Sequence, residues 1–452
     1  MLKRNHELDI TGGNITTGVL AFALPVIVTN VLQMLYNAAD MIVVGRFCGD
    51  ESLAAVGATG AVTNLVINLF IGFGAGVSAL VSRYIGARDR ERAHDAVHTS
   101  VALALVCGVV LAIFGVVFSR SMLHATNTPD NVIDYAALYM QIVFVGTPAN
   151  LMYNFGAAIL RSMGDTKRPL YFLTLSGIIN VLLNLFFVIV FNMNVAGVAL
   201  ATIISQYISA ALVIVTLLRS NSECRLIVRD VRFHLNELKL IIAIGLPAGL
   251  QTSMYSVSNV LIQSSVNSFG SKAMSGFSAG SNIFNFANAA MDAFTATAIV
   301  YVAQNFGARN FGRIRTSANI CFAYTFAMGT VMGFAIVHFG PALIGIYAPG
   351  NAEVVTLGMK YMIMFKYITG FGGANGVATS ALRGMGRSFV PMAVSIGGIC
   401  VFRVIWIMTA FAKWHTLEMI YVSYPISWVI TALTNIVLFY CVWNKLRKAP
   451  LE

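Results

Sequence analysis

The chain carries the same sequence pattern twice, about 222 residues apart. Three pairs of segments carry the match: YMQIVFVGTPANLMYNFGAAILRSMG (139–164) with YMIMFKYITGFGGANGVATSALRGMG (361–386), Leu24-Pro25 with Leu246-Pro247, and SRYIGARDRER (82–92) with AQNFGARNFGR (303–313), the last slipped by one residue. The period is far longer than the roughly 20 to 50 residues of a solenoid repeat. The duplication therefore indicates two similar halves of one fold.

Both halves are apolar enough to lie in a membrane. The chain is 58% hydrophobic and only 10% charged, whereas soluble domains carry about 25% charged residues. Apolar stretches of about 18 residues or more indicate transmembrane helices. We therefore predict an all-α integral membrane protein with twelve transmembrane helices in two six-helix lobes. The expected spans are 18–46, 52–82, 95–118, 131–160, 169–191, 195–218, 240–266, 272–303, 314–338, 352–382, 390–411 and 416–442.

The two lobes are expected to share one orientation in the membrane. Six helices per copy is an even number, so each copy begins and ends on the same side and the repeat is parallel. We predict an N-lobe at 1–218, a cytoplasmic linker at 219–239 and a C-lobe at 240–452. Secondary transporters are often built in this way, with the binding site near the membrane midplane at the repeat interface. One lobe rocking against the other would then alternate access to a central pathway.

The formal net charge of +11 is explained by topology. Most of the 29 Lys and Arg residues fall in segments that would face the cytoplasm if both termini lie inside, as the positive-inside rule requires. The polar start MLKRNHELD leads into a full span, so no cleavable signal peptide is expected. We predict a multi-pass protein of a prokaryotic inner membrane that contacts anionic lipid headgroups. Nucleic acid is not an expected partner.

Neither the cysteines nor any phosphate-binding motif indicates an enzyme. The six cysteines are scattered and form no CxxC pair, so neither a disulfide framework nor a cysteine metal site is predicted. No G-x-x-x-x-G-K-[ST] loop is present to bind ATP. We predict a protein that is not an enzyme, carries no cofactor and works as a monomer.

Asp40 is the strongest candidate for a functional acid. It lies inside the first predicted span, where a charge costs on the order of 3 kcal/mol, and removal from water favours the protonated form of a carboxylate. Asn180 and Asn184 share one face of the fifth span at i and i+4, and Thr202 lies in the sixth. These side chains could orient a carboxylate that takes and releases a proton, or complete a Na⁺ site. A carboxylate that only reaches outer water is the alternative.

Three further charges lie inside predicted spans. Asp292 follows a series of asparagines at nearly helical spacing: Asn282, Asn285 and Asn288. It could be a second titrating group, or it could pair with Lys366 or Arg403, which would neutralise a costly charge. We assign Lys366 to the substrate pathway and Arg403 to a structural role.

Tyrosines near the centres of predicted spans are candidates for contact with the substrate. Tyr36, Tyr153 and Tyr255 lie in segments expected to face a central cavity. Tyrosine faces attract organic cations, although core packing is the alternative role for each. We place these three residues, with Asp292 and Lys366, on the predicted substrate pathway.

The duplicated pattern resembles the multidrug and toxic-compound extrusion (MATE) transporters. The residues that carry the resemblance are Leu24-Pro25, Asp40 and Gly45 in the first span, the loops Gly86-Ala87-Arg88 and Gly307-Ala308-Arg309, and the helix ends Leu160-Arg161 and Leu382-Arg383-Gly384. The run QNFGA at 304–308 is similar to the QNxGA of many members. The resemblance covers essentially the whole chain.

The resemblance implies an inner-membrane antiporter that exports amphipathic, often cationic, compounds in exchange for H⁺ or Na⁺. In the prokaryotic branch resembling the DNA-damage-inducible type, it implies an ion-coupling site at Asp40, Asn180, Asn184 and Thr202. Asn184 stands where an Asp is common, so one carboxylate remains where the branch often has two. The branch resembling the NorM type uses acids at places that here hold Tyr255 and Gly372, so its C-lobe cation site is not expected.

We predict a proton-coupled exporter of amphipathic organic molecules, with Asp40 as the coupling carboxylate and Na⁺ as the alternative ion. A lipid-linked oligosaccharide flippase of the same superfamily is the second hypothesis, because Lys366 and Arg403 could contribute to a cationic cavity. Two acids in the spans weigh against that hypothesis. A channel is disfavoured because the two lobes differ in their polar residues.

Overall fold

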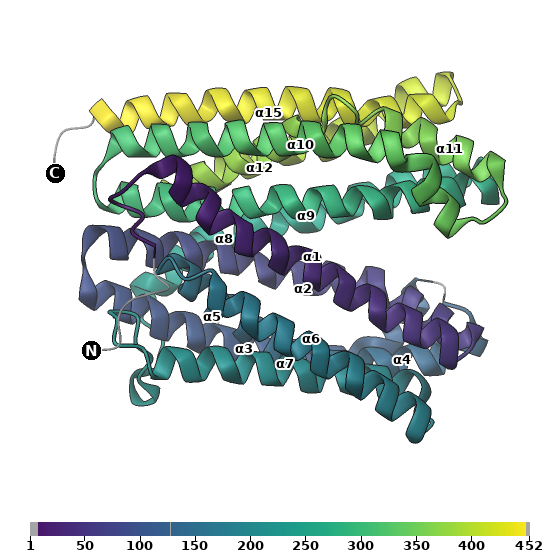
Figure 1. Ribbon diagram of the computed structural model, residues 1–452, viewed down its shortest axis with the longest axis horizontal. Coiled ribbons are helices and arrows are strands. Elements are labelled where there is room, and N and C mark those ends of the chain that lie inside the picture. Colours follow the sequence, from purple (N-terminus) through teal and green to yellow (C-terminus); the bar gives the residue numbers. More distant parts are fainter. Residues whose placement is uncertain (1–7, 127, 449–452) are drawn as a thin grey trace. The chain divides into compact units, whose positions relative to one another are not determined.

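The computed structural model of the chain describes residues 8–126 and 128–448. Every regular element in these residues is a helix (Figure 1). The first repeat contains α1 (Ile15–Phe47), α2 (Asp50–Ala87), α3 (Arg90–Ala125), α4 (Asp130–Val145), α5 (Thr147–Ser162), α6 (Lys167–Leu185), the π-helical turn η1 (Phe186–Val190) and α7 (Asn194–Leu218). After a short 3₁₀ turn η2 (Val228–Asp230), the second repeat contains α8 (Leu235–Asn267), α9 (Ser271–Gly307), α10 (Phe311–Tyr347), α11 (Ala352–Ile363), α12 (Thr369–Gly384), α13 (Phe389–Ser395), η3 (Ile396–Val401), α14 (Phe402–Trp406), η4 (Ile407–Phe411) and α15 (Leu417–Lys448).

The helices confirm the predicted all-α membrane fold. Among the described residues, 10 helices are long and apolar enough to cross a membrane, and the pair α4–α5, bent by 44°, would add one more. The remaining predicted span, 352–382, is a broken helix: α11 and α12 are separated by residues 364–368. Two of the twelve predicted spans are therefore not straight, and Pro148 lies in the first turn of α5, directly after the α4–α5 bend.

The sequence repeat is also a repeat of local structure. Arg88 after α2 and Arg309 after α9 both adopt the left-handed conformation, with φ of 58° and 55°. The next residues, Asp89 and Asn310, each accept a hydrogen bond from the backbone N–H three positions on, at 3.1 Å. Both side chains thus cap the helix that follows. The match between the two GAR loops is therefore a matched pair of helix-turn-helix connections.

The ends of α5 and α12 show the same correspondence. Gly164 and Gly386, the last residues of LRSMG and LRGMG, have φ of 86° and 79°. Glycine adopts this left-handed conformation without a Cβ penalty and commonly follows the end of a helix. The two glycines therefore end equivalent helices in the two repeats.

The helices form two compact units. Unit 1 comprises Val28–Gly249 together with the short segment that ends at Asp9, and unit 2 comprises Ile10–Ile27 together with the residues from Leu250 onward. The boundaries after Ile27 and Gly249 are 222 residues apart, each two residues after the proline inside α1 or α8, Pro25 or Pro247. The division of α1 and α8 therefore follows the repeat. The lobe boundaries at 218 and 240 stay a prediction.

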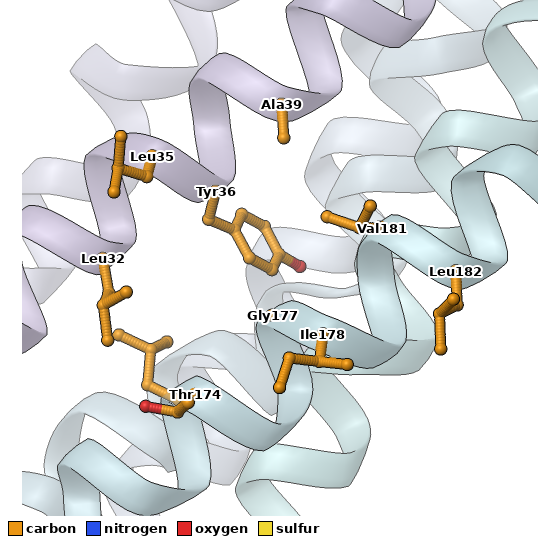
Figure 2. A pocket seen from close by; sticks show the side chains of 10 residues that line it. Leu32, Leu35, Tyr36, Ala39, Thr174, Gly177, Ile178, Val181 and Leu182 are labelled. Carbon is orange, nitrogen blue, oxygen red and sulfur yellow. The ribbon is translucent and has the colours of Figure 1, made fainter.

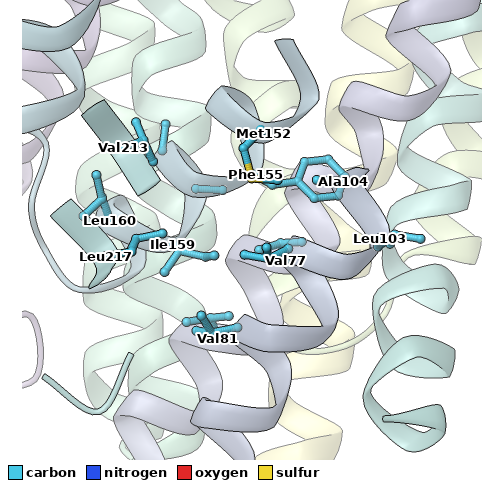
Figure 3. Close-up of a cluster of buried hydrophobic side chains, with 14 of the residues drawn as sticks. Val77, Val81, Leu103, Ala104, Met152, Phe155, Ile159, Leu160, Val213 and Leu217 are labelled. Carbon is cyan, nitrogen blue, oxygen red and sulfur yellow. The ribbon is translucent and has the colours of Figure 1, made fainter. Parts of the chain in front are cut away.

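The core of unit 1 consists mainly of aliphatic and small side chains, most of them from α2, α3, α5 and α7. Figure 3 shows Val77 and Val81 of α2, Ile159 of α5 and Val213 of α7 gathered in this cluster, and each is 0% exposed. Small residues on α3 and α5 complete it and allow close approach of the helices, which is how packing stabilises helical membrane proteins. This core holds α5 and α7 in place and so supports the polar residues that α7 carries.

The core of unit 2 is richer in aromatic rings. Phe284 and Phe365 lie 4.4 Å apart between ring centroids, and Tyr361 lies 5.3 Å from Tyr421. Most of these pairs have the tilted or edge-to-face geometry that aromatic rings prefer. The aromatic cluster joins α9, the α11–α12 break and α15 within this unit.

The predicted linker packs on the start of α3. The side chains of Cys224 and Leu226 are buried. The backbone N–H of Ile227 donates to Nε2 of His98 at 2.9 Å, and the N–H of His234 donates to Oγ1 of Thr99 at 3.1 Å. The segment is therefore an ordered connection between the two repeats.

Candidate functional site

The carboxylate of Asp40 is enclosed within unit 1. Asp40 lies on α1 and is 7% exposed. Its Oδ1 accepts a hydrogen bond from Nδ2 of Asn184, and its Oδ2 accepts one from Oγ1 of Thr202 at 3.0 Å. Asn184 is near the end of α6 and Thr202 is in α7. One acid on α1 is thus linked to α6 and α7, which follow each other much later in the sequence.

The second asparagine completes a four-residue network. Asn184 also donates to Oδ1 of Asn180 at 3.0 Å, and Asn180 donates to Oγ1 of Thr202 at 3.4 Å. Asn180 and Asn184 are both 0% exposed. The structure therefore brings together the four residues predicted as the ion-coupling site, because one turn of α6 separates the two amides and directs them to the same face.

One atom of this network has two alternative partners, and another has none. The amide Oδ1 of Asn184 is buried and has no hydrogen-bond partner. The hydroxyl of Thr202 also lies 2.9 Å from the carbonyl oxygen of Val198, so its single hydrogen can serve either Asp40 or that carbonyl. A buried acceptor without a donor carries a desolvation cost. The site is thus equipped to receive a proton, and its oxygens are also of the type that hard cations prefer.

Tyr36 lies one turn before Asp40 on α1 and lines an apolar groove. The groove has a volume of about 420 Å³ and is formed by side chains of α1 and α6, among them Leu35 and Val181. Figure 2 shows the ring of Tyr36 directed from α1 toward α6. Tyr36 is half-buried. Its position next to Asp40 along α1 keeps it a candidate for substrate contact.

Tyr153 lies in the core of unit 1 instead of in a cavity. Its side chain is 7% exposed, and its hydroxyl donates to the carbonyl oxygen of Pro169 at 3.2 Å. The ring packs within the aliphatic cluster of that unit. The structure does not support the predicted pathway role, because this face of α5 is turned toward its neighbouring helices.

Unit 2 contains a larger and more polar cavity, of about 590 Å³. It is lined by residues of α8, α9, α12, α14 and α15, by Tyr361 of α11 and by Ile399 of η3. Tyr255 and Asp292, both predicted on the pathway, line it together. The side chain of Asp292 is exposed to this space. Its volume is that of a cavity for a drug-sized molecule.

Lys366 and Arg403 lie at places that their predicted roles do not anticipate. Lys366 does not line the unit 2 cavity; its Nζ lies 4.9 Å from the ring centroid of Phe334 and 5.2 Å from that of Tyr367. Arg403, which we assigned to a structural role, does line the cavity. No ion pair within 4.0 Å joins either cation to Asp292, although all three side chains are described. Lys366 lies in the break between α11 and α12, where helical spacing no longer predicts which way a side chain points.

Several cavity residues were missed by the sequence reasoning, and two of them are polar and nearly buried. Gln251 of α8 and Asn375 of α12 both line the cavity and are nearly buried. Both are uncharged polar residues inside apolar spans, and this is the signal that could have found them. Gln251 also accepts a hydrogen bond from Nη2 of the buried Arg383 at 2.7 Å.

The fold and the two sites together define a multi-pass helical membrane protein with a buried acid in one unit and a polar cavity in the other. The family model described as MatE matches residues 25–186 and 247–409, which is more than half of the chain. The two matches begin at Pro25 and Pro247, the prolines of the repeat. The chain belongs to the MatE family, and it is a membrane transporter and not an enzyme.

Several relatives are similar over almost their full length. The chain is 27% identical over 435 residues to "Probable multidrug resistance protein YoeA" of Bacillus subtilis, covering 94% of this chain and 93% of that protein. It is 21% identical over 439 residues to "Multidrug export protein MepA" of Staphylococcus saprophyticus, covering 96% of each. A solved structure described as the outward-facing conformation of a multidrug resistance MATE family transporter matches with a TM-score of 0.89 and 23% identity, over 97% of this chain and 98% of that one. This last likeness shows the fold.

Proposed function

We propose that this protein exports small amphipathic organic compounds, often cationic, in exchange for H⁺, with Na⁺ as the alternative coupling ion. It works in a prokaryotic inner membrane with both termini in the cytoplasm. The names of its relatives as multidrug resistance and export proteins support the substrate class. The observation that carries the coupling role is the hydrogen-bonded enclosure of Asp40 in unit 1.

Protonation of Asp40 would change how α1 is held. The ionised carboxylate accepts hydrogen bonds from Asn184 and Thr202, and such charge-assisted bonds are roughly twice as strong as neutral ones. When a proton binds at Oδ2, the acid becomes a donor to Thr202, whose hydrogen then turns to the carbonyl of Val198. The link from α1 to α6 and α7 is weaker in this neutral state. Proton binding therefore favours a different packing of α1.

This local change can drive transport if each packing of α1 belongs to a different access state. In the proposed mechanism the lobes 1–218 and 240–452 rock about the linker, and Pro25 gives α1 a place to bend. A ligand can move such an equilibrium only through its different affinities for the two states. The proton and the organic substrate thus favour different access states of the protein, and they need not compete for the same binding atom.

The number of acids distinguishes this site from a site for Na⁺. Asn184 occupies the position where the branch resembling the DNA-damage-inducible type often has a second acid. One carboxylate with neutral oxygens from Asn180 and Thr202 gives a cation less charge compensation than two carboxylates do. This supports H⁺ as the main coupling ion.

The flippase hypothesis has less support than the exporter. A site for a lipid-linked pyrophosphate needs a markedly cationic cavity. The cavity of unit 2 is lined by Asp292 as well as Arg403, and Lys366 lies outside its lining. The mixed charge fits an amphipathic organic molecule better.

The coupling role is tested with Asp40→Asn in proteoliposomes that carry separately imposed H⁺ and Na⁺ gradients and a panel of organic dyes. The variant is expected to lose gradient-driven efflux. The matched control is Asp134→Asn, since Asp134 is an exposed acid of the same unit whose partner is Arg120 at 2.9 Å. Normal H⁺-driven efflux by Asp40→Asn would refute the proposal.

A further inference from the structure

The cavity of unit 2 holds two opposite charges that are not paired with each other. Among its described lining residues only Asp292 and Arg403 are charged, and they do not form an ion pair. We propose that this cavity binds a zwitterionic organic molecule, with Arg403 taking its carboxylate and Asp292 its cationic group. The inference rests on the proposed export function, because it names the substrate class that the second unit selects.

Arg403 is built into the wall with part of its hydrogen-bonding capacity unused. The residue is 3% exposed. Its Nε donates to Oγ of Ser427 at 3.3 Å, and its Cζ lies 3.9 Å from the ring centroid of Tyr424. These contacts orient the guanidinium, while its Nη2 has no hydrogen-bond partner. A buried donor without an acceptor is costly. A carboxylate bound in the cavity would supply the acceptor that Nη2 lacks.

The backbone around Arg403 is also unusual. Arg403 lies in the short helix α14, between the π-helical segments η3 and η4. Such π-helical insertions are rare and often occur at functional sites, because they rotate the following side chains out of the regular α-helical register. The register of this span therefore sets the direction of Arg403.

Asp292 lies on α9 and is exposed to the cavity, and no described residue donates a hydrogen bond to its carboxylate. A ligand that carries only a positive charge would satisfy Asp292 and leave Arg403 unpaired. A ligand that carries only a negative charge would satisfy Arg403 and bring that charge near Asp292. A molecule with both charges compensates each group, and complementary charges of this kind give specificity.

Neutral groups provide the rest of a binding surface. Gln251, held by Arg383, donates through Nε2 to the hydroxyl of Tyr255 at 2.9 Å. The Tyr255 hydroxyl is thus oriented and can still donate its own hydrogen. The rings of Phe284 and Trp428 also line the cavity, 5.6 Å apart between centroids. A mainly apolar wall with a few placed polar groups is typical of small-molecule sites.

The first repeat carries neither of the two charges at the equivalent positions. At the offset of 222 residues, Val181 occupies the position of Arg403. The position of Asp292 corresponds to Phe70, or to Ile71 if the one-residue slip near the GAR loops is applied. Unit 1 therefore has apolar residues at both places, and its helix α6 is regular around Val181 where unit 2 has π-helical segments on both sides of Arg403. In unit 2 both charged residues line the cavity.

The proposal is tested by fluorescence titration of the purified full-length protein in a non-ionic detergent, which supplies no charged headgroup. The probe is Nα-dansyl-lysine, which carries a carboxylate and a separate ammonium. Its methyl ester lacks the negative charge, and Nα-dansyl-norleucine lacks the positive one. Hydrogen bonds to charged groups contribute about 1.5–3 kcal/mol. The affinity for the zwitterion is therefore expected to be at least about tenfold higher than that for either analogue. Equal binding of the zwitterion and its ester would overturn the proposal.

Variants assign the two charges. Arg403→Gln should reduce the preference for the zwitterion over the ester to about twofold, and Asp292→Asn should reduce the preference over dansyl-norleucine in the same way. Lys366→Gln is the matched control, because this cation lies outside the cavity lining, and it should keep both preferences. Each preference is a ratio measured on one protein sample, so partial loss of folded protein cancels. An unchanged preference in Arg403→Gln would contradict the assignment.

The outcome is separable from that of the proposed coupling mechanism. Asp40→Asn is expected to keep both binding preferences while it loses H⁺-driven efflux. If Asp40→Asn transports normally, the coupling role of Asp40 fails and the binding site in unit 2 still stands. If the preferences are absent from the wild-type protein, the site fails and the coupling role is unaffected.

Discussion

The two membrane-embedded acids, Asp40 and Asp292, occupy opposite kinds of environment. Asp40 is buried in unit 1 and accepts hydrogen bonds from Asn184 and Thr202 on two neighbouring helices. Asp292 is exposed to a cavity in unit 2 and shares it with Arg403. A closed, hydrogen-bonded acid suits the smallest ligand, a proton. An acid that lines a cavity together with a cationic side chain suits a larger, organic ligand.

The difference arises because the two repeats carry different residues at equivalent positions of their helices. At the repeat offset, Asp40 corresponds to Ile262, which is 0% exposed in unit 2. The acid of unit 1 thus has no counterpart in unit 2, and the two charges of the unit 2 cavity have none in unit 1. The two repeats thus share their helices but carry their membrane-embedded charges at different positions.

The largest expected effect separates the two acids directly. Asp40→Asn should reduce H⁺-driven dye efflux by at least about tenfold, whereas Asp292→Asn should keep the dependence on the H⁺ gradient and raise the KM for cationic dyes. Removing the titrating group prevents exchange of the substrate for H⁺. Removing a charge from a binding cavity lowers only the affinity for the ligand. Efflux rates in proteoliposomes at several imposed pH gradients measure both. Loss of H⁺ dependence in Asp292→Asn would show that the two acids share one role.

The hydroxyl of Thr202 is expected to matter for the same step. Thr202→Val removes the donor to Oδ2 of Asp40, and a hydrogen bond to a charged group contributes about 1.5–3 kcal/mol, so efflux should fall by about tenfold. Thr202→Ser keeps the hydroxyl and should stay near the wild-type rate. The measurement is the initial efflux rate at a fixed pH gradient. Equal rates for the Val and Ser variants would remove Thr202 from the coupling site.

A second acid in unit 1 should change the preferred ion. Asn184→Asp places two carboxylates in contact with the oxygens of Asn180 and Thr202, a set better suited to Na⁺. We expect Na⁺-driven efflux to rise by a few-fold relative to H⁺-driven efflux. Proteoliposomes with only one of the two gradients give the ratio. An unchanged ratio would mean that the number of carboxylates does not select the ion.

The smallest expected effect concerns the stability of unit 2. Arg403→Met replaces a buried guanidinium that lacks a partner at Nη2, and apolar replacements of buried charges are often neutral or stabilising. The Tm should stay unchanged or rise by a few degrees, while binding of Nα-dansyl-lysine weakens. Thermal unfolding monitored without ligand checks this. A large fall in Tm would show that Arg403 is needed for folding rather than for binding.

The sequence by itself determined much of the fold and the site in unit 1. Apolar spans predicted the helices because lipid leaves the backbone no other way to satisfy its hydrogen bonds. The spacing of Asn180 and Asn184 predicted one polar face because a helix turns once in 3.6 residues. Asp40 was found because a carboxylate in an apolar span is costly and therefore rare.

Only the tertiary structure decided which polar face meets a cavity. Tyr153 looked equivalent to Tyr255, yet one lies in a packed core and the other in the cavity of unit 2. Arg403 lines that cavity and Lys366 does not, because the α11–α12 break at Lys366 and the π-helical segments beside Arg403 rotate the side chains out of regular register. Helical spacing tells which residues share a face, but packing against neighbouring helices sets where that face points.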